Sequence, residues 1–115
     1  GFIDVSGTFG NTAFGMGTLI SNTGGVSNTA IGLAAMVLNT DGQLNSALGN
    51  EALGKNTTGD SNVAIGRRAL YWNETGNNNT CVGANANTTT DTNAVNRIAL
   101  GYGAEAEADS LFQMM

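Results

Sequence analysis

Polar and apolar positions follow one another along this chain in a pattern that returns every seventeen residues. Its best-preserved part is a five-residue phrase with Asn first, a small residue third, a large apolar residue fourth and Gly fifth. The phrase occurs as NTAFG at 11–15, NTAIG at 28–32, NSALG at 45–49, NVAIG at 62–66 and NTCVG at 79–83. A fixed period of this length indicates a repeat architecture, so the pattern predicts the fold before any single residue is weighed.

Two further motifs keep the same spacing. A turn motif pairs Asn22 with Gly25, Asn39 with Gly42, Asn56 with Gly59 and Asn73 with Gly76. A small-then-large pair follows each phrase, as Thr18-Leu19, Ala35-Met36, Ala52-Leu53 and Ala69-Leu70. The sixth copy is degenerate: Asn96 falls on schedule, whereas Ala99-Leu100-Gly101 comes one residue late. A one-residue insertion beside the fifth coil would explain this.

The repeat predicts an all-β fold, a parallel β-solenoid of about six 17-residue coils. A helix is disfavoured because Gly and Asn interrupt every apolar pair before a second turn can form. The turn motif has the preferences of a type I turn, and stacking its asparagines predicts ladders of side-chain amide hydrogen bonds. About six coils at roughly 4.8 Å per rung make a rod of about 25–30 Å. We expect residues 1–104 to form the repeat domain, starting in mid-repeat, and residues 105–115 to form a closing or linker segment.

Apolar columns on this rod bear on assembly. Side chains alternate between the two faces of a strand, so the small third residue and the large fourth residue of each phrase point in opposite directions. A narrow coil interior suits the small residues, which leaves the large ones exposed and favours self-association. The alternative is a wider coil that buries the large column and turns the alanines outward. The large column consists of Phe14, Ile31, Leu48, Ile65, Val82 and Leu100, and a second one of Leu19, Met36, Leu53 and Leu70.

These phrases and turns resemble the trimeric β-roll repeats of bacteriophage tail fibres and the heads of trimeric autotransporter adhesins. The resemblance covers about residues 8–104, and the segment GYGAEAEADS at 101–110 is similar to one that closes such rolls. It implies a left-handed parallel β-roll, a homotrimer about a common axis and a role in attachment to cell surfaces. Adhesin heads usually have a somewhat shorter repeat, which favours a virion fibre. The chain departs from the pattern after residue 110, where no trimerising stalk follows.

Composition excludes several kinds of chemistry. The chain has no His, which removes the usual general base and the commonest metal ligand, so we expect neither an enzyme nor a cofactor. Its acidic turn residues occupy different repeat positions and form no carboxylate ladder, so no metal site is expected. A net charge of −5 argues against nucleic-acid binding. No apolar run reaches membrane-spanning length. Cys81 stands at a small-residue position and is interpreted as packing, without a His to activate it.

One cluster joins cations to aromatic residues. Arg67 and Arg68 precede Ala69-Leu70-Tyr71-Trp72. Tyr71, Trp72 and Arg67 are therefore candidates for contact with a glycan, because exposed aromatic rings stack on sugars. The structural interpretation is that the rings cover the end of an apolar column or pack against a neighbouring chain.

Three classes of function follow. The first is a structural attachment fibre on a virion or cell surface, hence extracellular, that mediates or supports binding to a surface glycan or protein receptor. The second is a subunit of a self-assembling extracellular filament, with the tail 111–115 docking on the next molecule. The third is an ice-binding solenoid, suggested by Thr12, Thr29 and Thr80, although Ser46, Val63 and Arg97 break that column.

Overall fold

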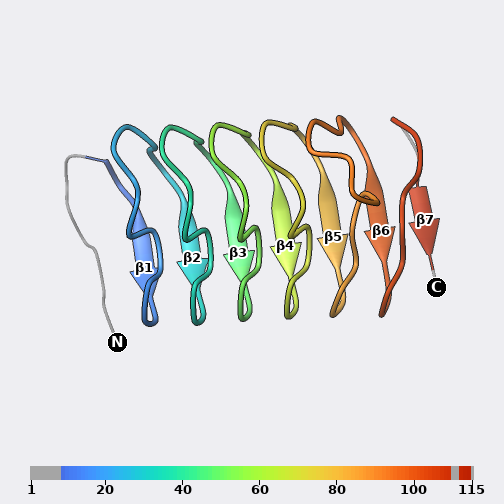
Figure 1. The fold of residues 1–115 in the computed structure, drawn as a ribbon, viewed down its shortest axis with the longest axis horizontal. Coiled ribbons are helices and arrows are strands. Elements are labelled where there is room, and N and C mark those ends of the chain that lie inside the picture. Colours follow the sequence, from blue (N-terminus) through green and yellow to red (C-terminus); the bar gives the residue numbers. More distant parts are fainter. Residues whose placement is uncertain (1–8, 110–111, 115) are drawn as a thin grey trace.

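A computed structural model describes residues 9–109 and 112–114 of the chain. The expected mid-repeat start at Gly1-Phe2-Ile3, together with Leu111 and Met115 of the tail, lies outside the described residues. The rest forms a rod of stacked coils with principal extents of 36 × 21 × 17 Å (Figure 1). The prediction of an all-β parallel solenoid is confirmed.

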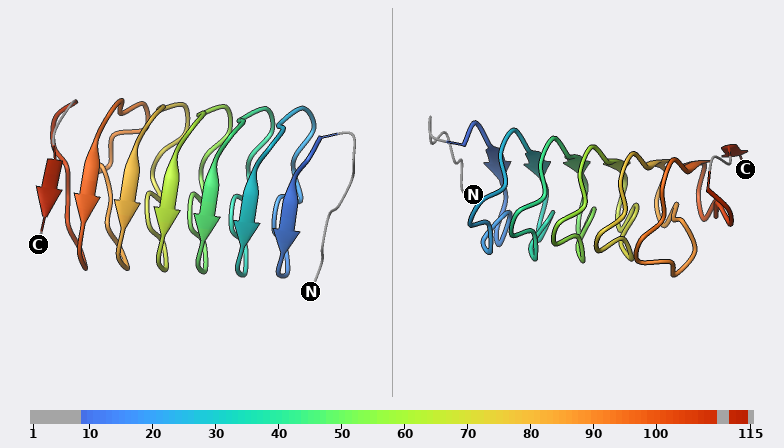
Figure 2. Two further views of the ribbon diagram at one scale, coloured as in Figure 1. Left: turned by 180° about the vertical axis from the view of Figure 1, so that it is seen from behind. Right: turned by 90° about the horizontal axis from the view of Figure 1, so that it is seen from above.

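Within residues 9–109 and 112–114, seven three-residue strands form one parallel sheet in chain order, one strand per coil. They are β1 Thr12–Phe14, β2 Thr29–Ile31, β3 Ser46–Leu48, β4 Val63–Ile65, β5 Thr80–Val82, β6 Ile98–Leu100 and β7 Phe112–Met114. Figure 2 shows the sheet along one side of the rod and the loops of the coils on the other. The phrase therefore supplies the strand of every coil from the first to the fifth.

The register of the sheet reproduces the sequence period. Thr12, Thr29, Ser46, Val63 and Thr80 stack on one another in steps of 17 residues. The next step is 18 residues, from Thr80 to Ile98, and the last is 14, from Ile98 to Phe112. β7 thus extends the sheet into the segment 105–115. The extra residue of the fifth coil lies between Ala86 and Thr92. Leu70 N–H donates to Ala86 O at the same spacing as the equivalent bond one coil earlier, whereas Glu74 N–H donates to Thr92 O, one residue further along than its equivalent.

Each coil turns at residues with left-handed backbone conformation. The large residue of every small-then-large pair has φ between 50 and 52°, and the residue before each phrase asparagine has φ between 56 and 64°. The phrase glycines have φ between 115 and 137°, a region that side-chain-bearing residues avoid. These recurring corners let a 17-residue segment close into a coil between strands of only three residues.

The core is narrow and built largely of small residues. The third phrase residues Ala13, Ala30, Ala47, Ala64, Cys81 and Ala99 are all buried. This excludes the alternative in which the alanines face outward. The second apolar column, Leu19, Met36, Leu53 and Leu70, is also buried and supplies the bulk of the interior. Burying each of these large side chains contributes about 1.5–3 kcal/mol, which offsets the strain of their left-handed backbone.

Two asparagine ladders run along the rod. In the first, each turn asparagine donates through Nδ2 to Oδ1 of the one before it, at 2.9 Å for Asn39 to Asn22 and 2.8 Å for Asn56 to Asn39 and for Asn73 to Asn56. Nδ2 of the same residue also donates to its own turn glycine: Asn22 to Gly25 O, Asn39 to Gly42 O, Asn56 to Gly59 O and Asn73 to Gly76 O. The predicted amide ladder is therefore present, and the side chain closes each turn.

The second ladder uses the phrase asparagines. Oδ1 of each accepts from the backbone N–H of its counterpart in the next coil, as in Asn45 N–H to Asn28 Oδ1 at 3.0 Å. Nδ2 donates across the coil to a turn glycine, as in Asn45 to Gly59 O at 2.8 Å. The glycine carbonyl thus joins both ladders. A Cβ on Gly42 would lie 2.5 Å from Asn39 Oδ1 and from Gly59 O, so only glycine leaves room for the amides.

The two ladders end in charged residues, one in the fifth coil and one at the start of the sixth. The expectation that Asn96 continues the phrase is wrong: Arg97 N–H donates to Asn79 Oδ1, so Arg97 takes the ladder position and Asn96 precedes it. Asp91 takes the position of the turn asparagine, because Thr92 follows Glu74 in the stack. The inserted residue shifted the later part of the coil by one, which the regular spacing of Asn96 concealed.

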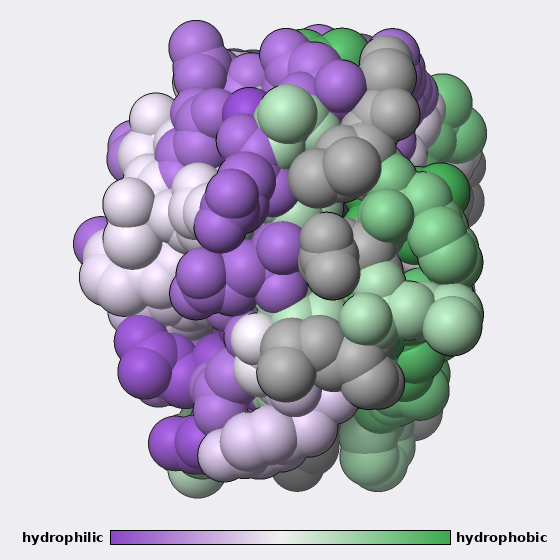
Figure 3. Space-filling view, turned by 90° about the vertical axis from the view of Figure 1, so that its right-hand side faces the viewer, coloured by the Kyte–Doolittle hydropathy of each residue, from purple (hydrophilic) through white to green (hydrophobic). Residues whose placement is uncertain are grey.

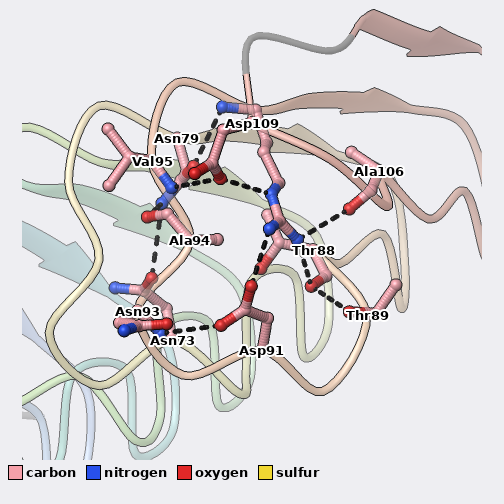
Figure 4. Close-up of polar contacts among 11 residues, drawn as sticks. Asn73, Asn79, Thr88, Thr89, Asp91, Asn93, Ala94, Val95, Ala106 and Asp109 are labelled. Atoms are coloured by element: carbon pink, nitrogen blue, oxygen red, sulfur yellow. Dashed lines mark hydrogen bonds and ion pairs between the residues drawn. The ribbon is translucent and has the colours of Figure 1, made fainter.

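Arg97 forms an ion-pair cluster with two aspartates, which we call the C-terminal clasp (Figure 4). Its Nη2 lies 2.6 Å from Asp91 Oδ2 and its Nε 2.9 Å from Asp109 Oδ1. Nη1 donates to Thr88 O and Ala106 O, each at 3.2 Å. The Arg97 side chain is only 7% exposed, so these partners are needed to compensate the charge that it buries.

Candidate functional site

The outward face of the sheet carries a continuous apolar column, which we call the apolar stripe. It consists of Phe14, Ile31, Leu48, Ile65, Val82, Leu100 and Met114, stacked in register. Phe14 is 51% exposed and Leu48 48%, whereas Val82 and Leu100 are half-buried. The opposite direction of the alanines is what turns this column outward, as the sequence predicted.

Hydrophobic residues gather on the sheet side of the molecule, and hydrophilic residues cover the opposite side (Figure 3). At the first two coils the stripe is widened by Met16 and Leu33, which are 76% and 51% exposed. At the third and fourth coils the equivalent positions are Asn50 and Arg67. The apolar surface is therefore wider at the first two coils than at the third and fourth.

A second column, exposed or half-buried along its length, borders the stripe at the start of each strand. Its residues are Thr12, Thr29, Ser46, Val63, Thr80, Ile98 and Phe112. The expectation that Arg97 belongs to this column is wrong, because the 18-residue step places Ile98 opposite Thr80. The column changes from hydroxyl to apolar side chains at three of its seven rungs, so it does not form a regular Thr array.

The aromatic cluster lies on the loops of the fourth coil. The rings of Tyr71 and Trp72 meet edge to face, with centroids 5.1 Å apart. Lys55 Nζ lies 5.0 Å from the Trp72 ring centroid, and Arg68 Cζ lies 3.9 Å from that of Tyr71. Arg68 Nε is also 3.1 Å from Glu51 Oε2. Cations of the same chain therefore already stack on both rings.

Of the three residues predicted to contact a glycan, Tyr71 and Trp72 are brought together and both are half-buried. The stacked guanidinium belongs to Arg68, whereas Arg67 is exposed two residues after β4, beside the apolar stripe. Tyr71 also fills the space that a Cβ on Gly54 would occupy, which ties its ring to the coil below. Glycan contact at this cluster stays a prediction.

Cys81 lies inside the rod among the core alanines. Burial raises the pKa of its thiol to about 12, so the thiol stays protonated at neutral pH. Its position suits the packing role that the sequence predicted. Because the sulfur faces the interior, it is not placed to meet a thiol of a second chain.

No protein-family model, curated protein or solved structure matches this chain. Residues 9–109 and 112–114 include no helix long and apolar enough to cross a membrane. The same residues contain no group of three or more His, Cys, Asp or Glu side chains placed to hold a metal ion. The candidate site is the outward face of the sheet, because large apolar side chains are exposed there.

Proposed function

We propose that this chain is a self-associating segment of an attachment fibre, on a virion tail or on a cell surface, that mediates or supports binding to host cells. Three copies bury their apolar stripes about a common axis, and the resulting rod presents its loops to a surface glycan or protein receptor. Many weak contacts multiplied over several chains then give useful avidity. An extracellular location follows from this proposal.

The exposed stripe is the single observation that supports the proposal most. Soluble monomers rarely leave a long contiguous apolar surface uncovered, and a stripe in register along seven rungs has the regular shape that a second copy can match. The hydrophilic loops on the opposite side remain available to solvent and to a receptor.

The test is the solution mass of the chain over a range of concentrations, measured by light scattering. We expect a trimer for the wild type and a monomer for Leu48→Asp, because a carboxylate in the stripe cannot be buried unpaired. Leu38→Asp is the matched control, since Leu38 is 47% exposed, against 48% for Leu48, but lies outside the stripe. A wild-type monomer at all concentrations would contradict the proposal, as would equal effects of the two variants.

Two other outcomes would favour the alternatives. Phe112 and Met114 are exposed on the last rung of the sheet, so mass that grows without limit would indicate the extracellular filament. Thermal hysteresis without a defined oligomer would indicate ice binding. Binding of the wild type, but not of Leu48→Asp, to a glycan array or to cells would support a fibre that attaches through multivalency.

A further inference from the structure

The outward face of the sheet is bordered by two columns that contribute one residue per coil, the first mostly half-buried and the second mostly exposed. The leading flank comes three residues before each strand, and the trailing flank comes two residues after it. The leading flank consists of Phe9, Val26, Gln43, Asp60, Asn77 and Val95. The trailing flank consists of Met16, Leu33, Asn50, Arg67, Ala84 and Tyr102.

The two flanks change chemistry together, coil by coil. In the first two coils both flanks are apolar, and in the third both carry an amide, Gln43 and Asn50. The fourth coil has an acid on the leading flank and a base on the trailing flank, Asp60 and Arg67. The fifth coil is uncharged on both flanks, and the sixth is again apolar or aromatic on both. Residues of one flank thus match residues of the other at the same height on the rod.

In the described part of the chain, neither Asp60 nor Arg67 forms an ion pair. Among the described residues, the ion pairs join Arg68 to Glu51 and Arg97 to its two aspartates. Oδ1 of Asp60 accepts from Gln43 N–H at 2.8 Å, which fixes the carboxylate at the border of the sheet. Arg67 is exposed at the other border. Asp60 is half-buried, so its second carboxylate oxygen and the exposed Arg67 guanidinium are the groups that a second chain could contact.

Symmetry decides which flanks can meet. Rotation about an axis parallel to the rod brings the leading flank of one copy to the trailing flank of the next, with equal coils at equal height. A face-to-face antiparallel arrangement brings like flanks together and never joins Asp60 to Arg67. A slip by one coil places Arg67 beside Gln43 or Asn77 and leaves Asp60 beside Asn50 or Ala84. Of these arrangements, only the parallel, in-register one joins Asp60 to Arg67.

We infer that, in the assembly about a common axis proposed above, Asp60 of one copy pairs with Arg67 of the next copy and thereby fixes the register of the coils. This inference rests on the proposed self-association and specifies its geometry. The apolar stripe supplies the buried area, and the single ion pair per interface selects the register, since like charges or unpaired charges penalise the alternatives.

The experiment is sedimentation velocity of full-length variants over a dilution series, after circular dichroism has shown that each variant folds. Arg67→Glu places two carboxylates together and should raise the concentration at which half the assembly dissociates by about tenfold or more. Asp60→Asn removes the charge but keeps an acceptor for Gln43 N–H, as Asn77 already does for Asp60 N–H at 2.7 Å. We therefore expect Asp60→Asn alone to weaken assembly only slightly, and to recover part of the assembly when added to Arg67→Glu.

Lys55→Glu is the matched control, because it changes the net charge equally on the aromatic cluster away from both flanks. Arg67→Glu should raise the concentration at which half the assembly dissociates more than Lys55→Glu does, and the difference between the two variants should become smaller at high salt. An assembled wild type with equal effects of the two variants and no recovery by Asp60→Asn would overturn the register while leaving self-association intact. A wild-type monomer would overturn both.

Discussion

At the scale of single residues, the coil depends on positions where the backbone adopts conformations that most residues avoid. Leucine or methionine occupies a left-handed corner in four successive coils, where burial of the side chain offsets the strain. The phrase glycines are required in the coil for a different reason. Their backbone lies against that of the next coil, so a side chain would have no space, and a residue that carries one would be strained at their φ.

Gly49→Ala should lower the free energy of unfolding by about 2–5 kcal/mol, the combined effect of backbone strain and overpacking. Gly49 has a φ of +137°, and a Cβ there would lie 2.6 Å from the carbonyl carbon and oxygen of Gly66. Urea unfolding followed by circular dichroism measures the change.

Gly17→Ala is the control for this substitution. Gly17 has a φ of +73°, but a Cβ there would meet no atom closer than 3.9 Å, and the equivalent residue of the next coil is already Ala34. We expect Gly17→Ala to lower the free energy of unfolding much less than Gly49→Ala does. Equal losses for the two variants would show that close backbone approach does not constrain the phrase glycines.

At the scale of elements, each strand is too short to be stable alone and depends on its neighbours in the stack. The two asparagine ladders connect successive coils, and the C-terminal clasp replaces them where they end. Arg97 and Asp91 stand at the last positions of the two ladders, so an ion pair takes over from amide hydrogen bonds at that end of the rod. Asp109 joins the clasp from the segment that leads to β7.

The clasp should make stability depend on pH in the acid range. Hydrogen bonds from Val95 N–H and from the Arg97 guanidinium hold the pKa of Asp109 below its usual value. A carboxyl whose pKa is lower in the folded than in the unfolded state stabilises the fold above the unfolded pKa. This contribution is lost as the pH falls through the folded pKa. The thermal midpoint of the wild type should therefore exceed that of Asp109→Asn at pH 7, and the gap should close below about pH 4.

Thermal unfolding between pH 7 and pH 2, followed by circular dichroism, measures this gap. Glu107→Gln is the control, because Glu107 is an exposed acid of the same segment with no ion pair among the described residues. Its midpoint should follow the wild type throughout. A gap between the wild type and Asp109→Asn that stays constant with pH would contradict a role for the Asp109 charge.

At the scale of the whole molecule, stability is a sum over coils and their interfaces with the coils above and below. A deletion should therefore preserve the fold only if it preserves the period of 17 residues, because the period sets which side chains face the core. A deletion of residues 46–62 joins Asn45 to Val63 and restores a complete phrase. We expect this chain, one coil shorter, to fold and unfold cooperatively with a somewhat lower thermal midpoint.

A deletion of residues 46–61 removes one residue fewer and serves as the comparison. It places Asn62 after Asn45 and shifts the following strand by one, which would turn its alanine outward and its isoleucine inward. Circular dichroism should show loss of cooperative unfolding or a much lower midpoint for this chain. Similar midpoints for the two deletions would mean that the period does not set the register.

By itself, the sequence determined the solenoid and the stacking of its phrases, because Asn, Ala and Gly recur at a fixed period of 17 residues. That Ala47 points inward and Leu48 outward was the favoured of two predictions, and burial in the tertiary structure decided between them. The tertiary structure decided what depends on contacts between coils: that the second apolar column is core, that Arg97 rather than Asn96 continues the ladder, and that Arg68 rather than Arg67 stacks on Tyr71. The reason is physical. A period specifies which residues stack, but long side chains choose partners in neighbouring coils, and the inserted residue of the fifth coil moves those partners by one position.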